Sequence, residues 1–112
     1  MINLDTKKFK AIQNSANGEI SEETIFAYRQ KGAIVIANYS GGQIVTGQLI
    51  GLISDDGNLE IRYHHINHDN EIQTGTCISK PEILGNGKIR LHETWQWTSG
   101  DFSKGTSIIE EI

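Results

Sequence analysis

The 112-residue chain has the length of a single domain, and 37% of its residues are hydrophobic while 21% are charged. This balance excludes a disordered chain, and no apolar run is long enough to span a bilayer. The net charge is −4 and the only basic cluster is Lys7, Lys8 and Lys10. Both nucleic acid and anionic membranes are therefore disfavoured as partners, because each needs a concentrated basic face.

Strand-like runs separated by glycine, asparagine and aspartate fill the chain, and helix signals are almost absent. We predict eight strands, near residues 8–15, 21–29, 33–39, 43–54, 58–67, 71–80, 87–98 and 105–111. The strongest turns are Asp56-Gly57 and Asn86-Gly87, whose residues tolerate the positive φ of a type I′ turn. Every connection is short, so consecutive strands must pair antiparallel.

These strands predict an all-β fold, a single antiparallel up-and-down β-barrel of about eight strands. Closure of the sheet would remove both exposed edges. An eight-stranded barrel has an interior just wide enough for packed side chains or one small ligand. We predict one barrel domain over residues 1–112 and leave open whether residues 1–7 are flexible.

The alternation of side chains predicts which residues face the interior. In the fifth predicted strand one face carries Leu59, Ile61, Tyr63 and His65, and in the seventh one face carries Ile89, Leu91, Glu93, Trp95 and Trp97. The fourth strand is apolar on both faces and gives no preference. Its Gly47 and Gly51 share one face and indicate a bend or a close approach of backbone.

Five of the predicted interior residues could form a polar-aromatic pocket: Tyr63, His65, Glu93, Trp95 and Trp97. A buried carboxylate is costly without a partner, so Glu93 requires either a cation such as His65 or Arg62 or a hydrogen-bonding ligand. The alternative is structural, with Glu93 and His65 hydrogen-bonded inside the barrel or at its rim and the tryptophans filling the core. The two interpretations stay open here.

Other chemistry-bearing residues give weaker signals. His64 and His65 are adjacent and must point to opposite faces of a strand, while His68 lies in the next turn, so no metal site is predicted. Cys77, as a lone buried cysteine, is expected to be an inert hydrophobe. A separate group, Thr98, Ser99 and Asp101, could contact a ligand at the rim, but local hydrogen bonds to the backbone are the favoured explanation.

Compartment and assembly are constrained only in part. Residues 1–10 hold no apolar stretch of signal-peptide length, and the single cysteine excludes an internal disulfide. We therefore expect a cytoplasmic protein. No cofactor is predicted, and a homodimer is left open.

The chain resembles a family of small uncharacterised bacterial proteins. The segments that carry the resemblance are NGE at 17–19, YSGG at 39–42, GQLIG at 47–51, RYHH at 62–65 and LHETWQWTSGD at 91–101. Members often carry the label "n-acetylglutamate synthase", and their domain is avidin-like, an eight-stranded barrel related in shape to avidins and lipocalins. The resemblance thus implies both a barrel and an acetyltransferase, and these implications conflict. Acetyl transfer usually relies on a mixed α/β fold whose strand-to-helix loop holds the pyrophosphate of acetyl-coenzyme A, and no such segment is found here.

Three functions follow from these observations. We favour a non-catalytic module that binds a small, partly apolar molecule, with Tyr63, His65, Glu93, Trp95 and Trp97 lining its site. The second is an enzyme, either the acetyltransferase of the family label or one in which Glu93 and His65 act as an acid and base. The third is a structural or oligomerising barrel with a filled core.

Overall fold

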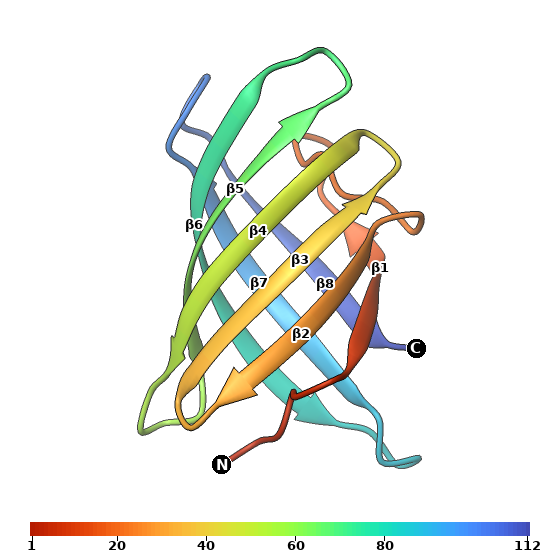
Figure 1. Ribbon diagram of the computed structural model, residues 1–112, viewed down its shortest axis with the longest axis vertical. Coiled ribbons are helices and arrows are strands. Elements are labelled where there is room, and N and C mark those ends of the chain that lie inside the picture. The colour runs from red at the N-terminus through yellow and green to blue at the C-terminus, as the bar shows by residue number, and fades with distance from the viewer.

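The computed structural model describes residues 1–112 as eight strands and no helix (Figure 1). The strands are β1 (Lys8–Asn14), β2 (Ile25–Lys31), β3 (Ile34–Gly41), β4 (Ile44–Ile53), β5 (Leu59–Asn67), β6 (Ile72–Ile83), β7 (Ile89–Trp97) and β8 (Lys104–Glu111). No segment forms a helix with the length and apolarity needed to cross a membrane.

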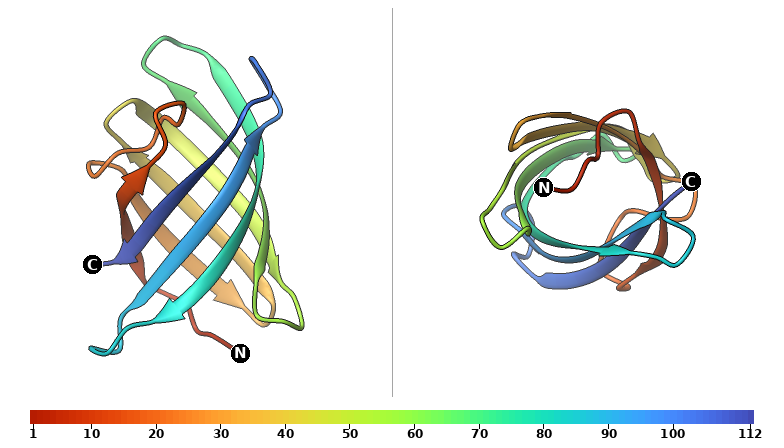
Figure 2. Two further views of the ribbon diagram at one scale, coloured as in Figure 1. Left: turned by 180° about the vertical axis from the view of Figure 1, so that it is seen from behind. Right: turned by 90° about the horizontal axis from the view of Figure 1, so that it is seen from below.

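The sheet closes on itself. Each strand pairs antiparallel with its neighbours in sequence, and β1 pairs with β8 to complete the barrel. The end-on view shows the resulting ring of strands (Figure 2). The predicted all-β, antiparallel, up-and-down barrel of eight strands is confirmed.

The second predicted strand, 21–29, begins too early. In the structure Ser21 and Thr24 form a turn, because the Ser21 N–H donates to Thr24 Oγ1 at 3.0 Å and the Thr24 N–H donates to the Ser21 carbonyl at 2.9 Å. Residues 15–24 are therefore one long loop, and β2 starts only at Ile25. Hydroxyl side chains that bond to nearby backbone favour such turns over strands.

The predicted end of the sixth strand at residue 80 is also wrong, because β6 continues through Pro81 to Ile83. Pairing with β5 stops at Ser79, so Pro81 pairs with β7 alone, opposite Leu91. Proline is tolerated where one side of a strand is an edge, since its missing N–H costs no ladder bond there.

The hairpins at Asp56-Gly57 and Asn86-Gly87 are not type I′ turns. The Gly57 N–H donates to the Ser54 carbonyl at 2.9 Å, and the Ser54 N–H donates to the Asn58 carbonyl at 2.8 Å. Only the glycine has positive φ, 87°. This is a three-residue loop whose third residue is left-handed, and residues 84–88 repeat it.

Residues 1–7, whose flexibility the sequence left open, pack across the lower end of the barrel (Figure 2). Leu4 is completely buried, and its N–H donates to Gln30 Oε1 at 2.8 Å. The Thr6 N–H donates to the Tyr28 carbonyl at 3.1 Å. This end of the interior is thus closed by apolar packing.

Leu4→Ala should lower the free energy of unfolding by about 2 to 4 kcal/mol, the usual cost of removing a fully buried leucine. The matched control is Leu52→Ala on the outer face of β4, where the side chain is 56% exposed, and it should cost about 0.5 kcal/mol or less. Urea denaturation of the two variants provides the comparison. Equal losses would show that residues 1–7 do not seal the barrel.

Candidate functional site

The structure brings the five predicted pocket residues together inside the barrel. His65, Glu93, Trp95 and Trp97 are buried, and Tyr63 is partly buried. Trp97 contacts three aromatic rings edge-on, with centroid distances of 5.4 Å to Trp95, 5.8 Å to Tyr63 and 5.8 Å to His65. The period-two alternation of β5 and β7 places all of them on the inner face.

A cavity of about 50 Å³ lies among these residues, in the upper half of the interior. Its lining combines aromatic, aliphatic and polar side chains: Asn14, Gly18, Glu19, Ile20, Phe26, Tyr39, Leu49, Ile61, Tyr63, His65, Cys77, Glu93, Trp95, Trp97 and Ser107. In the lower half, Leu4, Phe9, Leu59, Leu91 and Ile109 are fully buried and fill the barrel. The interior is therefore packed at one end and partly hollow toward the other.

Glycines on neighbouring strands make room for the aromatic walls. Tyr39 lies directly opposite Gly47 in the β3–β4 register, and Trp95 lies directly opposite Gly105 in the β7–β8 register. A Cβ at either glycine would collide with the facing ring. The rings can therefore lie back against the barrel wall, which leaves the centre open.

Glu93 sits at the middle of three adjacent interior positions, with Ser79 opposite it on β6 and Ser107 opposite it on β8. Ser107 Oγ donates to Glu93 Oε1 at 3.1 Å. Burial raises the pKa of Glu93 to about 7, although hydrogen bonds from Ser107 and Ser79 lower it in part. The carboxyl group is thus poised to gain or lose a proton near neutral pH.

The expected cationic partner of Glu93 is wrong. Arg62 lies on the outer face, where its Nη2 is 3.2 Å from Glu60 Oε1. His65 is held elsewhere, by Glu19 and Tyr39. Glu93 therefore has only hydroxyl donors, and no positively charged side chain neutralises it.

Two further polar groups in this region are buried without a hydrogen-bond partner. They are Tyr28 Oη and Asn14 Oδ1, and Asn14 lines the cavity. Burial and the nearby Glu93 and Cys77 raise the pKa of the Tyr28 hydroxyl, which is therefore a neutral donor. Unpaired buried polar groups are rare because each carries a desolvation cost, so they point to an absent partner.

At the upper end, the loop between β1 and β2 is bound to the far wall through Glu19. His65 Nε2 donates to Glu19 Oε1 at 2.7 Å, and the Tyr39 hydroxyl donates to His65 Nδ1 at 2.9 Å. Asn67 Nδ2 donates to Glu19 Oε2 at 2.9 Å. Burial lowers the pKa of His65, while the bond to Glu19 opposes that shift.

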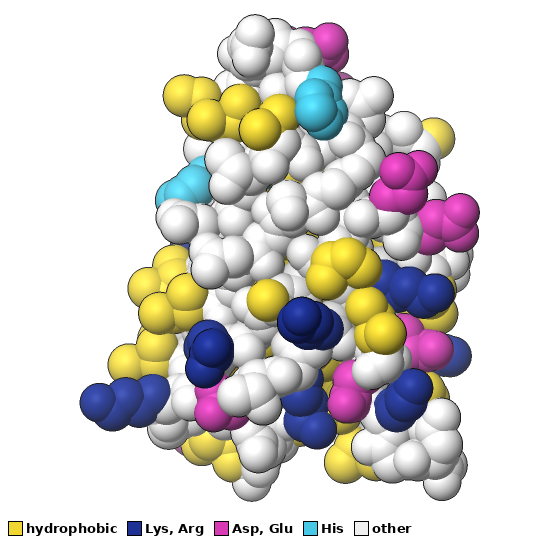
Figure 3. Space-filling view, turned by 45° about the vertical axis from the view of Figure 1, so that its right-hand side comes forward, with side chains coloured by type: hydrophobic (Ala, Val, Ile, Leu, Met, Phe, Trp, Pro, Cys, Tyr) yellow, Lys and Arg dark blue, Asp and Glu magenta, His cyan; other side chains and the backbone are white.

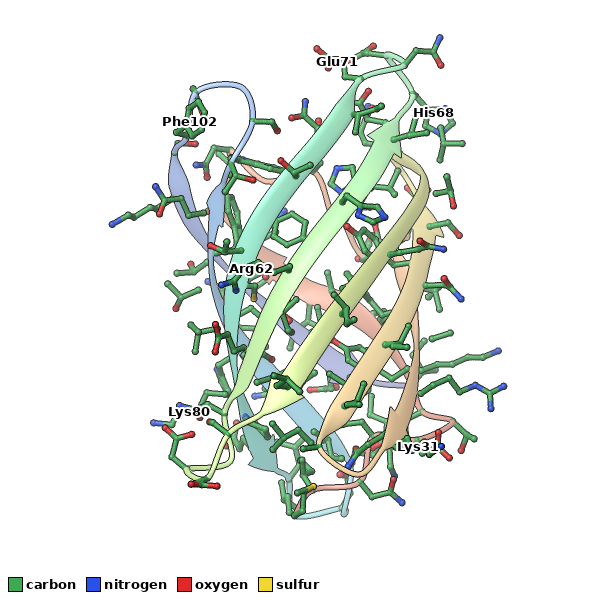
Figure 4. All side chains as sticks on the ribbon, turned by 60° about the vertical axis from the view of Figure 1, so that its left-hand side comes forward. Lys31, Arg62, His68, Glu71, Lys80 and Phe102 are labelled. Atoms are coloured by element: carbon green, nitrogen blue, oxygen red, sulfur yellow. The ribbon has the colours of Figure 1, made fainter.

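The same loop is also tied to β7 and β8. Trp97 Nε1 donates to the Asn17 carbonyl at 3.0 Å, and Asn17 Nδ2 donates to the Lys104 carbonyl at 2.9 Å. Residues 15–24 therefore cross the upper opening of the barrel, its mouth, and contact β5 through Glu19 and β7 through Asn17. Figure 4 shows the other connections at this end, one carrying His68 and Glu71 and one carrying Phe102, with Lys31 and Lys80 near the opposite end.

The sequence prediction missed Glu19, Asn17 and Asn67. The predicted strands 8–15 and 21–29 left only a short connection, with no loop to carry Asn17 and Glu19 across the barrel, and Asn67 stood at the predicted end of the fifth strand. One available signal was the need of a buried His65 for a partner at the mouth, which an acidic residue in a neighbouring connection could meet. Finding that residue required the true length of the connection between β1 and β2, which runs over residues 15–24.

The remaining candidates stay outside the cavity or serve local structure. Asp101 Oδ1 accepts from the Ser103 N–H at 2.9 Å, as the local explanation predicted. For Ser99 that explanation is wrong, because Ser99 Oγ donates to Gln73 Oε1 at 2.6 Å and accepts from the Thr74 N–H at 3.1 Å, both near the start of β6. His64 is exposed on the outer face, opposite to His65. No group of three or more His, Cys, Asp and Glu residues is arranged to hold a metal ion. Burial raises the pKa of the Cys77 thiol, which lines the cavity.

Comparison with known proteins gives one match. Residues 2–112 match the sequence model of the family described as "Avidin-like protein". The chain belongs to the avidin-like protein family. The match covers all eight strands of the avidin-like barrel, and its description names no enzymatic activity. A search of curated proteins found no match.

Glu93→Gln should remove a pH dependence of stability from the avidin-like barrel. The pKa of Glu93 is raised from 4.5 to about 7 by burial, so the folded protein holds this proton more tightly than the unfolded chain. The stabilisation that the protonated Glu93 gives to the folded protein is complete below pH 4.5 and is lost as the pH rises through about 7. Relative to the native protein, the variant should gain on the order of 3 kcal/mol between about pH 5 and pH 8.

Urea denaturation at both pH values measures this difference. The control is Glu60→Gln, which changes an exposed carboxyl on β5. Parallel pH profiles for the native protein and Glu93→Gln would contradict the raised pKa.

Proposed function

We propose that this barrel binds a small molecule in the cavity at its upper end, without catalysing a reaction. The supporting observation is the cavity itself, which lies against the two tryptophans and the uncompensated carboxyl of Glu93. Ligand sites combine apolar and aromatic walls with a few polar groups that fix orientation. The avidin-like family match supports a ligand-binding type of barrel.

The size of the cavity limits what it can hold. A water molecule needs roughly 10 to 15 Å³ measured in this way, so about 50 Å³ admits a group of roughly three to five non-hydrogen atoms. A larger ligand must displace the loop that carries Glu19. A filled structural core is the alternative, and it does not account for a cavity beside unpaired polar groups.

The catalytic alternatives receive no such support. An acid–base pair would require Glu93 and His65 to act on one group, but each has its own hydrogen-bond partners, Ser107 for the first and Glu19 with Tyr39 for the second. Acetyl-coenzyme A and glutamate are both anions. The cavity has no lysine or arginine in its lining to receive them.

A cavity-filling variant tests the proposal. Cys77→Leu adds apolar volume inside the cavity, and Thr76→Leu adds it on the outer face of the same strand. The chain has only two tryptophans, and both line the cavity, so their two indole N–H resonances report directly on an occupant. The probes are neutral, cationic and anionic compounds of roughly four to six non-hydrogen atoms.

We expect at least one probe to shift both indole resonances of the native protein and of Thr76→Leu, and to leave those of Cys77→Leu unchanged. Thermal denaturation of each variant confirms that it is folded. Failure of every probe to shift either resonance in the native protein would contradict a binding function.

A further inference from the structure

The interior of the barrel is an acidic environment. Two carboxyl groups, Glu93 and Glu19, line the cavity, and the only basic side chain there is His65. His65 already donates to Glu19, and burial lowers its pKa, so it is neutral near pH 7. None of the ten lysines and arginines is buried, and Figure 3 shows such side chains on the outer surface.

Glu93 lies deepest of these charged groups and lacks a counter-ion. Its hydrogen-bond donor is the neutral hydroxyl of Ser107. A buried carboxylate costs several kcal/mol unless it is paired, so an ionised Glu93 is stabilised most by a cation that enters the cavity. A ligand anion would meet the opposite situation, with two acidic groups and no positive charge to offset them.

An unpaired acceptor in the cavity lining gives a second, independent observation. Asn14 Oδ1 is buried without a partner, and Asn14 lies opposite Ser107, which in turn lies opposite Glu93. An amide oxygen can accept a hydrogen bond from a ligand N–H, and an ammonium group offers three N–H donors. The carboxylate of Glu93 and the amide oxygen of Asn14 form a complementary set for it.

The walls suit the same class of ligand. Trp95 and Trp97 lie next to each other on the inner face of β7, two and four residues beyond Glu93. The face of an indole ring attracts a cation and also packs well against methylene groups. A short alkyl chain bearing one positive charge would place its charge at Glu93 and its methylene groups against Trp95 and Trp97.

Building on the proposed binding function, we propose that the ligand is a compact organic cation, whose ammonium group pairs with Glu93 at the floor of the cavity and whose alkyl part lies against Trp95 and Trp97. The size of the cavity restricts the enclosed part to a short chain. Three probes of nearly equal size separate charge from shape: propylammonium, 1-propanol and propanoate.

The test measures binding of each probe through the two tryptophan indole N–H resonances at about pH 8. At this pH Glu93 is mostly ionised, because its pKa is about 7. Propylammonium should bind about tenfold or more tightly than 1-propanol, as expected for a charge-assisted hydrogen bond, and propanoate should bind most weakly. In Glu93→Gln this preference should vanish, while 1-propanol binding persists through apolar contact.

Lowering the pH of the native protein provides a second measurement that needs no variant. At about pH 5 Glu93 is protonated, so propylammonium should bind more weakly while 1-propanol is unaffected. The tyrosines and the cysteine around the carboxyl, which are Tyr28, Tyr39, Tyr63 and Cys77, have raised pKa values and stay neutral over this range. The Glu19–His65 pair also faces the cavity, and Glu93→Gln separates its titration from that of Glu93.

The outcomes distinguish this inference from the proposed function. Binding of 1-propanol or propanoate as tightly as propylammonium, or an unchanged preference in Glu93→Gln, would overturn the cationic ligand and leave the binding function intact. Failure of all three probes in the native protein would overturn both. Glu60→Gln, on the outer face, should behave as the native protein.

Discussion

Closure of the sheet is the constraint on which the site depends. β1 is the seam: it pairs with β2 over only Lys8 to Lys10, and with β8 from Phe9 to Asn14 around a bulge between Ala11 and Gln13. Once the seam is made, every inward-facing residue of eight strands shares one enclosed space. A carboxyl group on an inward-facing position, such as Glu93, is then buried through strand alternation and closure together. The raised pKa is a direct result of this enclosure.

Inside that space, small and large residues are matched across neighbouring strands. Gly47 receives the ring of Tyr39, Gly75 receives Tyr63 and Gly105 receives Trp95, each pair directly opposite in register. Aromatic side chains that would otherwise meet at the barrel axis are held along the wall. In the lower half Gly51 lies opposite the aliphatic Val35 and Ile61 and receives no aromatic ring, and Leu59, Leu91 and Ile109 pack to the centre. The hollow and the filled halves thus differ in the side chains that lie opposite their glycines.

The sequence was sufficient for the inner face of β5 and β7, because a strand exposed to two environments shows a period of two. It was not sufficient for β4, where Ile50 and Leu52 on the outside are as apolar as Leu49 on the inside. Gly47 was interpreted as a bend or a close approach of backbone, and the structure shows that it makes space for the ring of Tyr39 on the neighbouring strand. That function depends on strand register, which no single strand reveals.

The mouth was the least predictable part. Glu19 reaches His65 across 46 positions of sequence, and this contact exists only because residues 15–24 form a loop long enough to cross. Local patterns predict turns and strands, but they carry no information about which side chain a long loop delivers to a distant wall. The position of Glu93 could be predicted from alternation, whereas its lack of a cation required the placement of every other charged residue.

Residues 1–7 seal one end of the barrel, and this makes the cavity a chamber with a single entrance. Anything that arrives and anything that departs must pass the loop held by Glu19 and Asn17. A gate used in both directions changes association and dissociation rates by the same factor, so it governs residence time and leaves equilibrium affinity to the walls and floor. For the proposed ligand, the loop and the chamber would therefore control separate properties, the rate of exchange and the strength of binding.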